Sequence, residues 1–264
     1  MSTTTTETLN PSKTWFAGGA LVTVLVLLLA GAMVWSWLSG ESRPNTESQS
    51  QIYRQPIGRI EISSAAGDLT VSAGPDGEVG VDRRLEWTAH KPTYTEQWNG
   101  DTLRITVRCP DGKLGCSVHY TIRVPRSISV RAHTDAGDLD IRDLSGDIKA
   151  ETEAGRTTLE NTKGKLYARS GNGDLTATGI TSAEIDLGTG AGHVDLRLSG
   201  VPSLVRTSSG AGDVRVRVPA NPSGYQVRAD TNAGRRVVEV QDVPASPHRI
   251  EASTSAGDVT VAGS

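Results

Sequence analysis

The chain repeats one short pattern eight times, and each copy is centred on a glycine that follows an alanine or, once, an asparagine. Seven residues before the glycine stands Ile, Leu or Val, three before it Ser or Thr, and four after it an apolar residue. Because several columns hold together in one register, the pattern indicates a structural repeat. The eight turn glycines are Gly67, Gly137, Gly155, Gly173, Gly192, Gly212, Gly234 and Gly257.

Each copy has the pattern of a strand, a turn and a second strand. Apolar or small residues alternate with polar ones on both sides of the glycine, as a strand with one buried face requires. The glycine permits the backbone to turn from one strand into the next. One unit cannot bury its apolar face alone, so the copies must stack about 4.8 Å apart. The sequence therefore predicts an all-β fold, a parallel β-solenoid of the single-stranded β-helix type.

The spacing of the copies divides the body of the protein into two segments. Residues 130–264 hold seven copies and predict a β-solenoid of about seven turns. Residues 57–129 hold the first copy and an insertion with strand-like runs and the aromatic residues Trp87, Tyr94, Trp98 and Tyr120. A solenoid end exposes strand edges, so we expect this insertion to form a β-rich cap with the aromatic residues in its core. A ligand-binding aromatic platform is the alternative.

The residue that follows the turn glycine alternates in charge along the sequence. Like charges about 5 Å apart repel by roughly 1 kcal/mol in water, so alternation would replace repulsion with attraction between stacked copies. Surface ion pairs are weak, and the alternation is therefore better evidence of register than of stability. The predicted charge ladder consists of Asp138, Arg156, Asp174, His193, Asp213, Arg235 and Asp258.

An uncharged apolar run extends from Trp15 to Leu38 and predicts a transmembrane helix at 14–38. It exceeds the roughly 20 residues that span a bilayer, and Trp15, Trp35 and Trp37 stand where interfacial aromatic residues are expected. A cleaved signal peptide is the alternative, although the run is long for a signal core and no clear cleavage site follows. Residues 1–13 would then be a cytoplasmic tail, and the polar residues 39–56 a flexible stalk.

Two features of the chain favour opposite orientations in the membrane. Lys13 precedes the apolar run whereas Arg43 and Arg54 follow it, which slightly favours a cytoplasmic body. The only two cysteines, Cys109 and Cys116, flank a predicted hairpin turn and could form a disulfide, which persists outside the cytoplasm. Two unpaired thiols are the alternative. We predict the disulfide and a single-pass protein of the cell membrane with an extracytoplasmic body.

Composition and motifs argue against several kinds of chemistry. The net charge of −3 gives no electrostatic case for binding nucleic acid. Glycines do recur nine residues apart from Gly137 to Gly173, but the glycine–aspartate motif of calcium-binding repeats is absent. The five histidines show no metal-ligand spacing, and no nucleophile elbow occurs. We therefore expect no metal, no cofactor and no catalytic site.

The connections between copies lengthen toward the C-terminus. Loops on a rigid stack are where solenoids vary and bind, so residues 218–226 and 240–249 are the predicted binding loops. Their candidate contact residues are Pro219, Asn221, Tyr225, Asp242 and His248.

Three segments carry a resemblance to a known family: IEISSAAGDLTV at 60–71, VPRSISVRAHTDAGDLDI at 124–141, and the related units SGAGDV at 209–214 and TSAGDV at 254–259. The chain resembles bacterial β-strand-repeat proteins classed as putative adhesins within a domain-of-unknown-function group. The resemblance covers residues 60–261 and implies a membrane segment before a stacked β-strand body, with no catalytic residues.

The expected function is a non-enzymatic, membrane-anchored, adhesin-like binding module at the cell surface, with an unidentified surface ligand or protein partner. The alternative is an envelope-stress or regulatory accessory protein that contacts a membrane partner. A polysaccharide-active β-helix enzyme is the third hypothesis, although aromatic residues that could bind sugar are few.

Overall fold

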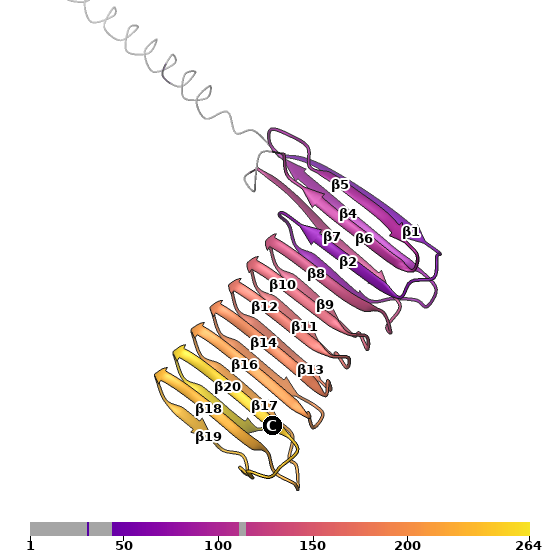
Figure 1. The fold of residues 1–264 in the computed structure, drawn as a ribbon. Helices are drawn as coiled ribbons and strands as arrows, with labels where there is room; N and C mark the ends of the chain where they lie inside the picture. Colours follow the sequence, from indigo (N-terminus) through magenta and orange to yellow (C-terminus); the bar gives the residue numbers. More distant parts are fainter. Residues whose placement is uncertain (1–30, 32–43, 111–114) are drawn as a thin grey trace, which may run out of the picture. The chain divides into compact units, whose positions relative to one another are not determined.

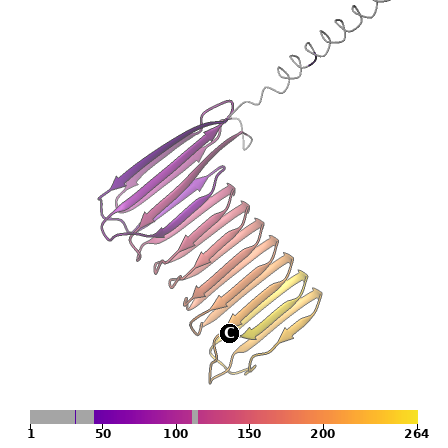
Figure 2. The ribbon, with the colours of Figure 1, turned by 180° about the vertical axis from the view of Figure 1, so that it is seen from behind.

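The computed structural model describes residue 31 and residues 44–110 and 115–264, and residues 44–264 form one compact unit of two facing sheets (Figures 1 and 2). Over residues 44–110 and 115–264 the secondary structure is strand and turn. In spatial order, sheet A has 11 strands: β1 (Asn45–Tyr53), β4 (Val79–Trp87), β7 (Cys116–Val124), β3 (Leu69–Ala73), β9 (Leu139–Arg142), β11 (Thr157–Glu160), β13 (Leu175–Ile180), β15 (Val194–Leu198), β17 (Val214–Val218), β21 (Val259–Gly263) and β19 (Arg236–Val238). Sheet B has 10 strands: β18 (Gln226–Ala233), β20 (Arg249–Ala256), β16 (Leu204–Ala211), β14 (Glu184–Ala191), β12 (Leu166–Asn172), β10 (Ile148–Ala154), β8 (Ser129–Ala136), β2 (Arg59–Ser64), β6 (Thr102–Arg108) and β5 (Thr93–Asn99).

Each repeat copy forms one turn of a parallel stack and contributes one strand to each sheet. Equivalent residues pair in register, so that Ile148 of β10 lies between Val130 of β8 and Leu166 of β12. The aliphatic columns face inward and form one continuous core between the sheets. The predicted all-β, parallel stacked architecture is therefore confirmed for the described residues.

Two features of the structure require glycine at the turn positions. Each has a positive φ, from 117° at Gly67 to 150° at Gly234, which side-chain-bearing residues rarely adopt. The turns also stack too closely for a side chain, because a Cβ on Gly155 would lie 2.0 Å from the carbonyl oxygen of Gly137. The hydroxyl column supports the same turn from inside: the hydroxyls of Ser209 and Thr254 donate to the carbonyls of Gly192 and Gly212, both at 2.8 Å.

The order of the last two turns differs from the sequence order. The final copy, β20 and β21, lies between the turn of β16 and β17 and the turn of β18 and β19. The exchange is explained by the side chain at one core-facing position, which comes two residues after the turn glycine. It is Arg236 in β19, which remains exposed at the open end of the stack, whereas Val259 of β21 is fully buried. An interior position would bury the Arg236 charge, which is costly.

The N-terminal end is closed by the insertion. The first copy, β2 and β3, stacks directly on β8 and β9, so the segments 57–129 and 130–264 share both sheets. Beyond it, β6 and β7 continue the stack in parallel, and β5 and β4 pair antiparallel to them. Antiparallel edge strands end the parallel stack, as expected for a cap.

The predicted flexible stalk at 39–56 is wrong over residues 45–53. These residues form strand β1, which pairs antiparallel with β4 along its whole length. Their polarity was misleading because an edge strand needs few apolar side chains, and β1 has none that is fully buried.

Several predictions fall outside the described residues. They are the tail at 1–13, the helix at 14–38 except for Gly31, and the turn at Asp111–Gly112. Over the part of the chain that the structure describes, no helix is both long enough and apolar enough to cross a membrane. The membrane anchor stays a prediction.

Candidate binding surface

The predicted charge ladder is wrong as an alternating row of ion pairs. The exchange of the last two turns places Asp213 beside Asp258 instead of Arg235. Among the described residues, Arg156 has no ion pair within 4.0 Å, and the ladder contains one arginine–carboxylate pair, Arg235–Asp258 at 2.8 Å.

The aspartates of this row have a different role, because each accepts a hydrogen bond from the backbone of the next turn. Asp138 Oδ1 accepts from the amide of Arg156 at 2.8 Å, and Asp213 Oδ1 accepts from the amide of Asp258 at 2.9 Å. Asp258 accepts from the amide and side chain of Arg235, and these bonds hold its pKa below the usual value. The repeated Gly-Asp therefore links successive turns through backbone amides.

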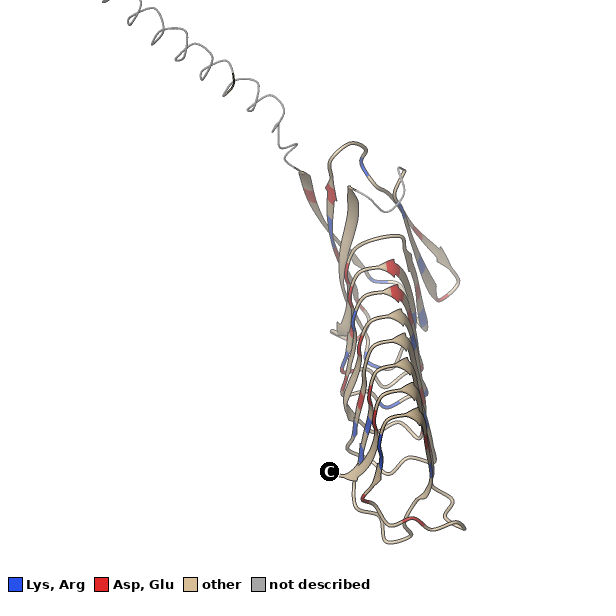
Figure 3. Cartoon of the chain, turned by 90° about the vertical axis from the view of Figure 1, so that its left-hand side faces the viewer, with Lys and Arg blue, Asp and Glu red and all other residues tan. Residues whose placement is uncertain are grey.

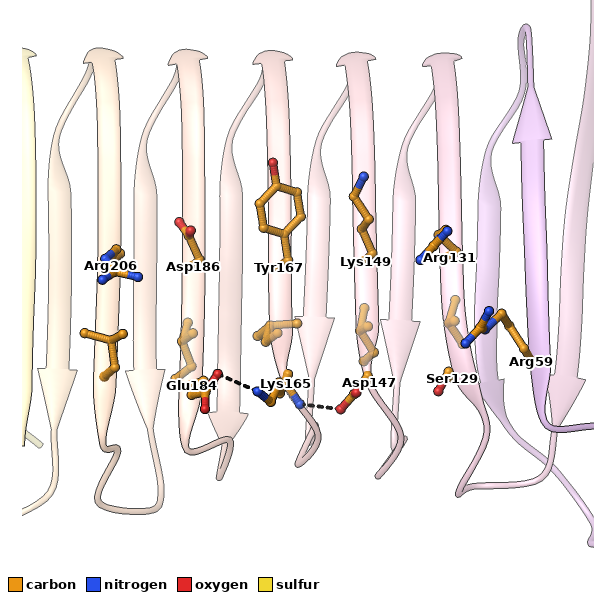
Figure 4. A pocket seen from close by; sticks show the side chains of 15 residues that line it. Arg59, Ser129, Arg131, Asp147, Lys149, Lys165, Tyr167, Glu184, Asp186 and Arg206 are labelled. Carbon is orange, nitrogen blue, oxygen red and sulfur yellow. Dashed lines mark hydrogen bonds and ion pairs between the residues drawn. The ribbon is translucent and has the colours of Figure 1, made fainter.

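The outer face of sheet B carries three neighbouring hollows that share lining residues. The central one, of about 350 Å³, lies over β8 to β16 between two rows of outward-facing side chains (Figure 4). A second, of about 440 Å³, shares Asp186 and Arg206 with it and continues toward β18. A third, of about 230 Å³, shares Arg131 with it and continues toward β6. The shared residues Arg131, Asp186 and Arg206 stand in one row between the central hollow and the other two. We call the three hollows together the sheet-B groove.

Side-chain size shapes this groove. In the second hollow, Ser208 and Ser253 form a low floor, and Arg169, Arg206 and Arg228 rise around it. Gly188 lies beside Ser208 on β14, and a Cβ there would lie 3.2 Å from Arg169 Nε. Gly188 is itself buried beneath the side chains of Ser208 and Arg169, so the accessible floor of the hollow lies at the exposed Ser208 and Ser253.

Tyr167 stands in the middle of the central hollow. Lys149 Nζ lies 5.4 Å from its ring centroid and Arg169 Cζ lies 4.6 Å from it. In the facing row, Lys165 forms an ion pair with Glu184 at 2.8 Å, and its amide donates to Asp147 (Figure 4). Acidic and basic residues occur along both sheets (Figure 3), but on sheet B they line hollows.

The residues of the predicted binding loops are engaged within the protein. Tyr225 is 2% exposed and its hydroxyl donates to the carbonyl of Pro219 at 2.7 Å. Asp242 accepts from the amide of Val227, and Asn221 donates to the carbonyl of Gly224. His248 Nδ1 lies 2.7 Å from the carbonyl oxygen of Pro202 and its ring packs edge-on against Tyr225. These contacts hold the loops against one another and against the last turns of the stack. Binding by the loops stays a prediction.

Cys109 and Cys116 form a disulfide in the structure, with their Cα atoms 5.8 Å apart. The bond joins the end of β6 in sheet B to the start of β7 in sheet A. It therefore ties the two sheets together within the N-terminal cap.

A buried polar cluster in the cap has no counterpart in the sequence prediction. Arg83 of β4 and Glu96 of β5 form an ion pair at 2.6 Å, with side chains 11% and 6% exposed. Tyr53 also donates to Glu96, while Tyr94 donates to Gln49. Burial, followed by the bond to Glu96, raises the pKa of Tyr53 to about 12. The cluster draws on three strands far apart in sequence, so spacing alone could not identify it.

Of the aromatic residues predicted to form the core of the cap, one lies in the core and three lie at its edge. Tyr120 is 1% exposed, and Trp87, Tyr94 and Trp98 pack against the core from its edge.

Within residues 44–110 and 115–264, His, Cys, Asp and Glu side chains form no group of three that could hold a metal ion.

The chain belongs to the family Toastrack DUF4097, which matches residues 57–261. Among solved structures, a putative adhesin from Bacteroides fragilis has a TM-score of 0.50 at 15% identity, covering 83% of this chain and 97% of that one. A putative cell adhesion protein from Clostridium sporogenes has a TM-score of 0.39 at 12% identity, covering 83% and 100%. A putative lipid binding protein from Parabacteroides distasonis has a TM-score of 0.35 at 8% identity, covering 83% and 94%.

None of the curated proteins compared with the chain matches it. The solved neighbours are too distant to show more than the fold. Neither the family nor these three neighbours is named for an enzymatic activity.

Proposed function

We propose that the chain is a non-enzymatic binding module displayed at the cell surface, and that its ligand lies in the sheet-B groove. The observation that carries this proposal is the grouping of three hollows on one face of the stack, where neighbouring hollows share the wall residues Asp186, Arg206 and Arg131. An extended, shallow, polar surface suits a long ligand that lies along it. The adhesin names given to relatives of this fold agree with a binding role.

The test of this function uses the full-length chain in detergent micelles and insoluble bacterial envelope material. The unaltered chain is expected to sediment with this material. Ser208→Trp, which fills the floor of the second hollow, is expected to lower the bound fraction on the order of fivefold.

The matched control for this test is Thr176→Trp, which adds the same side chain to the outer face of sheet A on β13. It should leave sedimentation unchanged. An unaltered chain that stays in the supernatant would refute the binding function, and equal losses in the two variants would refute its location on sheet B.

We also propose that residues 14–38 anchor the chain and that its body faces the outside of the cell. The disulfide between Cys109 and Cys116 supports this orientation, because such bonds persist in oxidising compartments. A membrane-impermeant thiol reagent added to intact cells should label the full-length chain only after mild reduction. Labelling without reduction would exclude the disulfide, and labelling that requires cell lysis would place the body inside.

A further inference from the structure

One end of the sheet-B groove carries an excess of positive charge. Arg104 forms an ion pair with Glu61 at 2.8 Å, and Arg131 lies 4.0 Å from the same carboxylate. Arg59 lies beside Arg131 at the end of the central hollow (Figure 4), and no described carboxylate lies within 4.0 Å of it. Three guanidinium groups thus gather around one carboxylate. The pKa of Glu61 is lowered by its hydrogen bond to Arg104 and by the charges of Arg131 and Arg59.

Two of these arginines are available to a ligand. Arg104 is occupied by two hydrogen bonds to Glu61, whereas Arg131 makes only the long contact at 4.0 Å. Arg59 and Arg131 come from the adjacent strands β2 and β8 and line the same hollow. Guanidinium groups in this arrangement recognise carboxylate, sulfate or phosphate through paired hydrogen bonds.

The middle of the groove has a different character. Asp147, Glu184 and Asp186 line the hollow there, but Lys149, Lys165 and Arg206 line it with them, so the charges around Tyr167 balance. Beyond them, the floor of the second hollow is formed by the hydroxyl-bearing Ser208 and Ser253. A charge-balanced surface attracts anions little, while its carboxylates accept hydrogen bonds from hydroxyl groups and its ammonium and guanidinium groups donate to them, so this part suits a ligand that is rich in hydroxyls and poor in negative charge.

This division argues against a uniform polyanion. A nucleic acid strand carries a phosphate at every nucleotide, and the middle of the groove offers these phosphates no excess of positive charge, because its three carboxylates balance its three basic side chains. A glycan meets both requirements, because its acidic groups are separated by hydroxyl-bearing rings. Tyr167 lines the same hollow and provides an aromatic ring for contact with a sugar ring, with the cationic groups of Lys149 and Arg169 beside it.

We propose that the sheet-B groove binds a linear acidic glycan, with an acidic substituent held by Arg59 and Arg131 and the sugar hydroxyls held by Asp186, Glu184 and Ser208. This inference rests on the proposed function and specifies its ligand. The acidic substituent can be a carboxylate or a sulfate, because both fit the two guanidinium groups. The turns of the stack repeat about every 4.8 Å, so a linear polymer lying along the axis meets the next side chain of each row at every turn.

The experiment measures binding of the full-length chain in detergent micelles to four immobilised polymers. Polygalacturonate carries carboxylates on sugars, dextran sulfate carries sulfates on sugars, dextran is a neutral sugar polymer, and polyglutamate carries carboxylates without sugars. At least one acidic glycan is expected to bind about tenfold or more tightly than both dextran and polyglutamate. The acidic glycan that binds more tightly then identifies the substituent as a carboxylate or a sulfate.

The double variant Arg59→Gln/Arg131→Gln should weaken binding of that glycan about tenfold to a hundredfold and flatten its dependence on salt. The matched control removes two exposed arginines elsewhere, in Arg156→Gln/Arg197→Gln; neither has an ion pair within 4.0 Å among the described residues, and Arg197 lies on sheet A. The control variant should bind as the unaltered chain does.

Three results would overturn the inference. They are equal binding of polyglutamate and the acidic glycans, equal effects of the two double variants, and no binding of any glycan by a chain whose far-UV circular dichroism shows the native β-sheet signal. The inference can fail while the proposed function stands, because a chain that sediments with envelope material in a Ser208-dependent way but binds no acidic glycan has another ligand in the same groove.

Discussion

Gly155→Ala is expected to destabilise the folded stack by about 3 kcal/mol or more. Its φ of 145° costs a residue with a side chain about 1–3 kcal/mol. The new Cβ would also lie 2.0 Å from the carbonyl oxygen of Gly137, a backbone atom held by the adjacent turn, so that turn would have to separate. Chemical denaturation of the full-length chain in micelles, followed by the far-UV circular dichroism of the β-sheet, measures the loss.

Two other glycines separate the contributions to this loss. Gly77 has a φ of 79°, but a Cβ added there would have no neighbour within 4 Å. Gly77→Ala should therefore cost only the backbone strain, about 1–2 kcal/mol. Gly263 has neither a positive φ nor a neighbour within 4 Å, so Gly263→Ala should be close to neutral. If Gly155→Ala cost no more than Gly77→Ala, close stacking of the turns would not be the reason for the glycine column.

Arg83→Ala is expected to cost about 3–5 kcal/mol, because it leaves the Glu96 carboxylate buried without its charge partner. The two side chains are 11% and 6% exposed, so water can replace little of the lost interaction. Replacing both groups, in Arg83→Met/Glu96→Leu, removes the buried charge altogether and should restore much of the lost stability. Denaturation midpoints of the two variants, measured side by side, make the comparison.

The exposed pair Arg228–Asp230 is the control for this prediction. Its side chains are 80% and 62% exposed, and Arg228→Ala should not change the denaturation midpoint measurably. Arg83→Met/Glu96→Leu could instead prove less stable than Arg83→Ala. The cluster would then stabilise the cap through its hydrogen bonds to Tyr53 and Gln49 more than through charge balance.

The repeat predicted the architecture well because its columns report local geometry. The inward aliphatic column, the hydroxyl column and the turn glycine each repeat in every turn, and each has the same neighbours in every turn. The order of the turns is a different kind of information, since it depends on which copy can tolerate solvent. Arg236 is the one charged residue at its core-facing position, and that exception indicates which turn lies at the open end.

The groove and the cap cluster were beyond the sequence prediction for a different reason. The hollows depend on side-chain sizes across neighbouring strands, such as Ser208 beside Gly188, and these become visible only when the register is known. The cap cluster joins Gln49, Arg83 and Glu96, which stand on three strands of a non-repeating segment. Strand β1 was missed because its polar side chains face this cluster and the solvent, and they gave no apolar alternation.

The exchanged order of the last two turns has a consequence for how the chain is made. Polypeptides are synthesised from the N-terminus, and residues 226–238 therefore appear before residues 249–263, although the later segment occupies the inner place. Until the ribosome has released almost the last residue, the edges of β16 and β17 lack their final partners. A premature stop codon near residue 240 would therefore remove an interior turn and leave the growing stack with the wrong neighbour at its end.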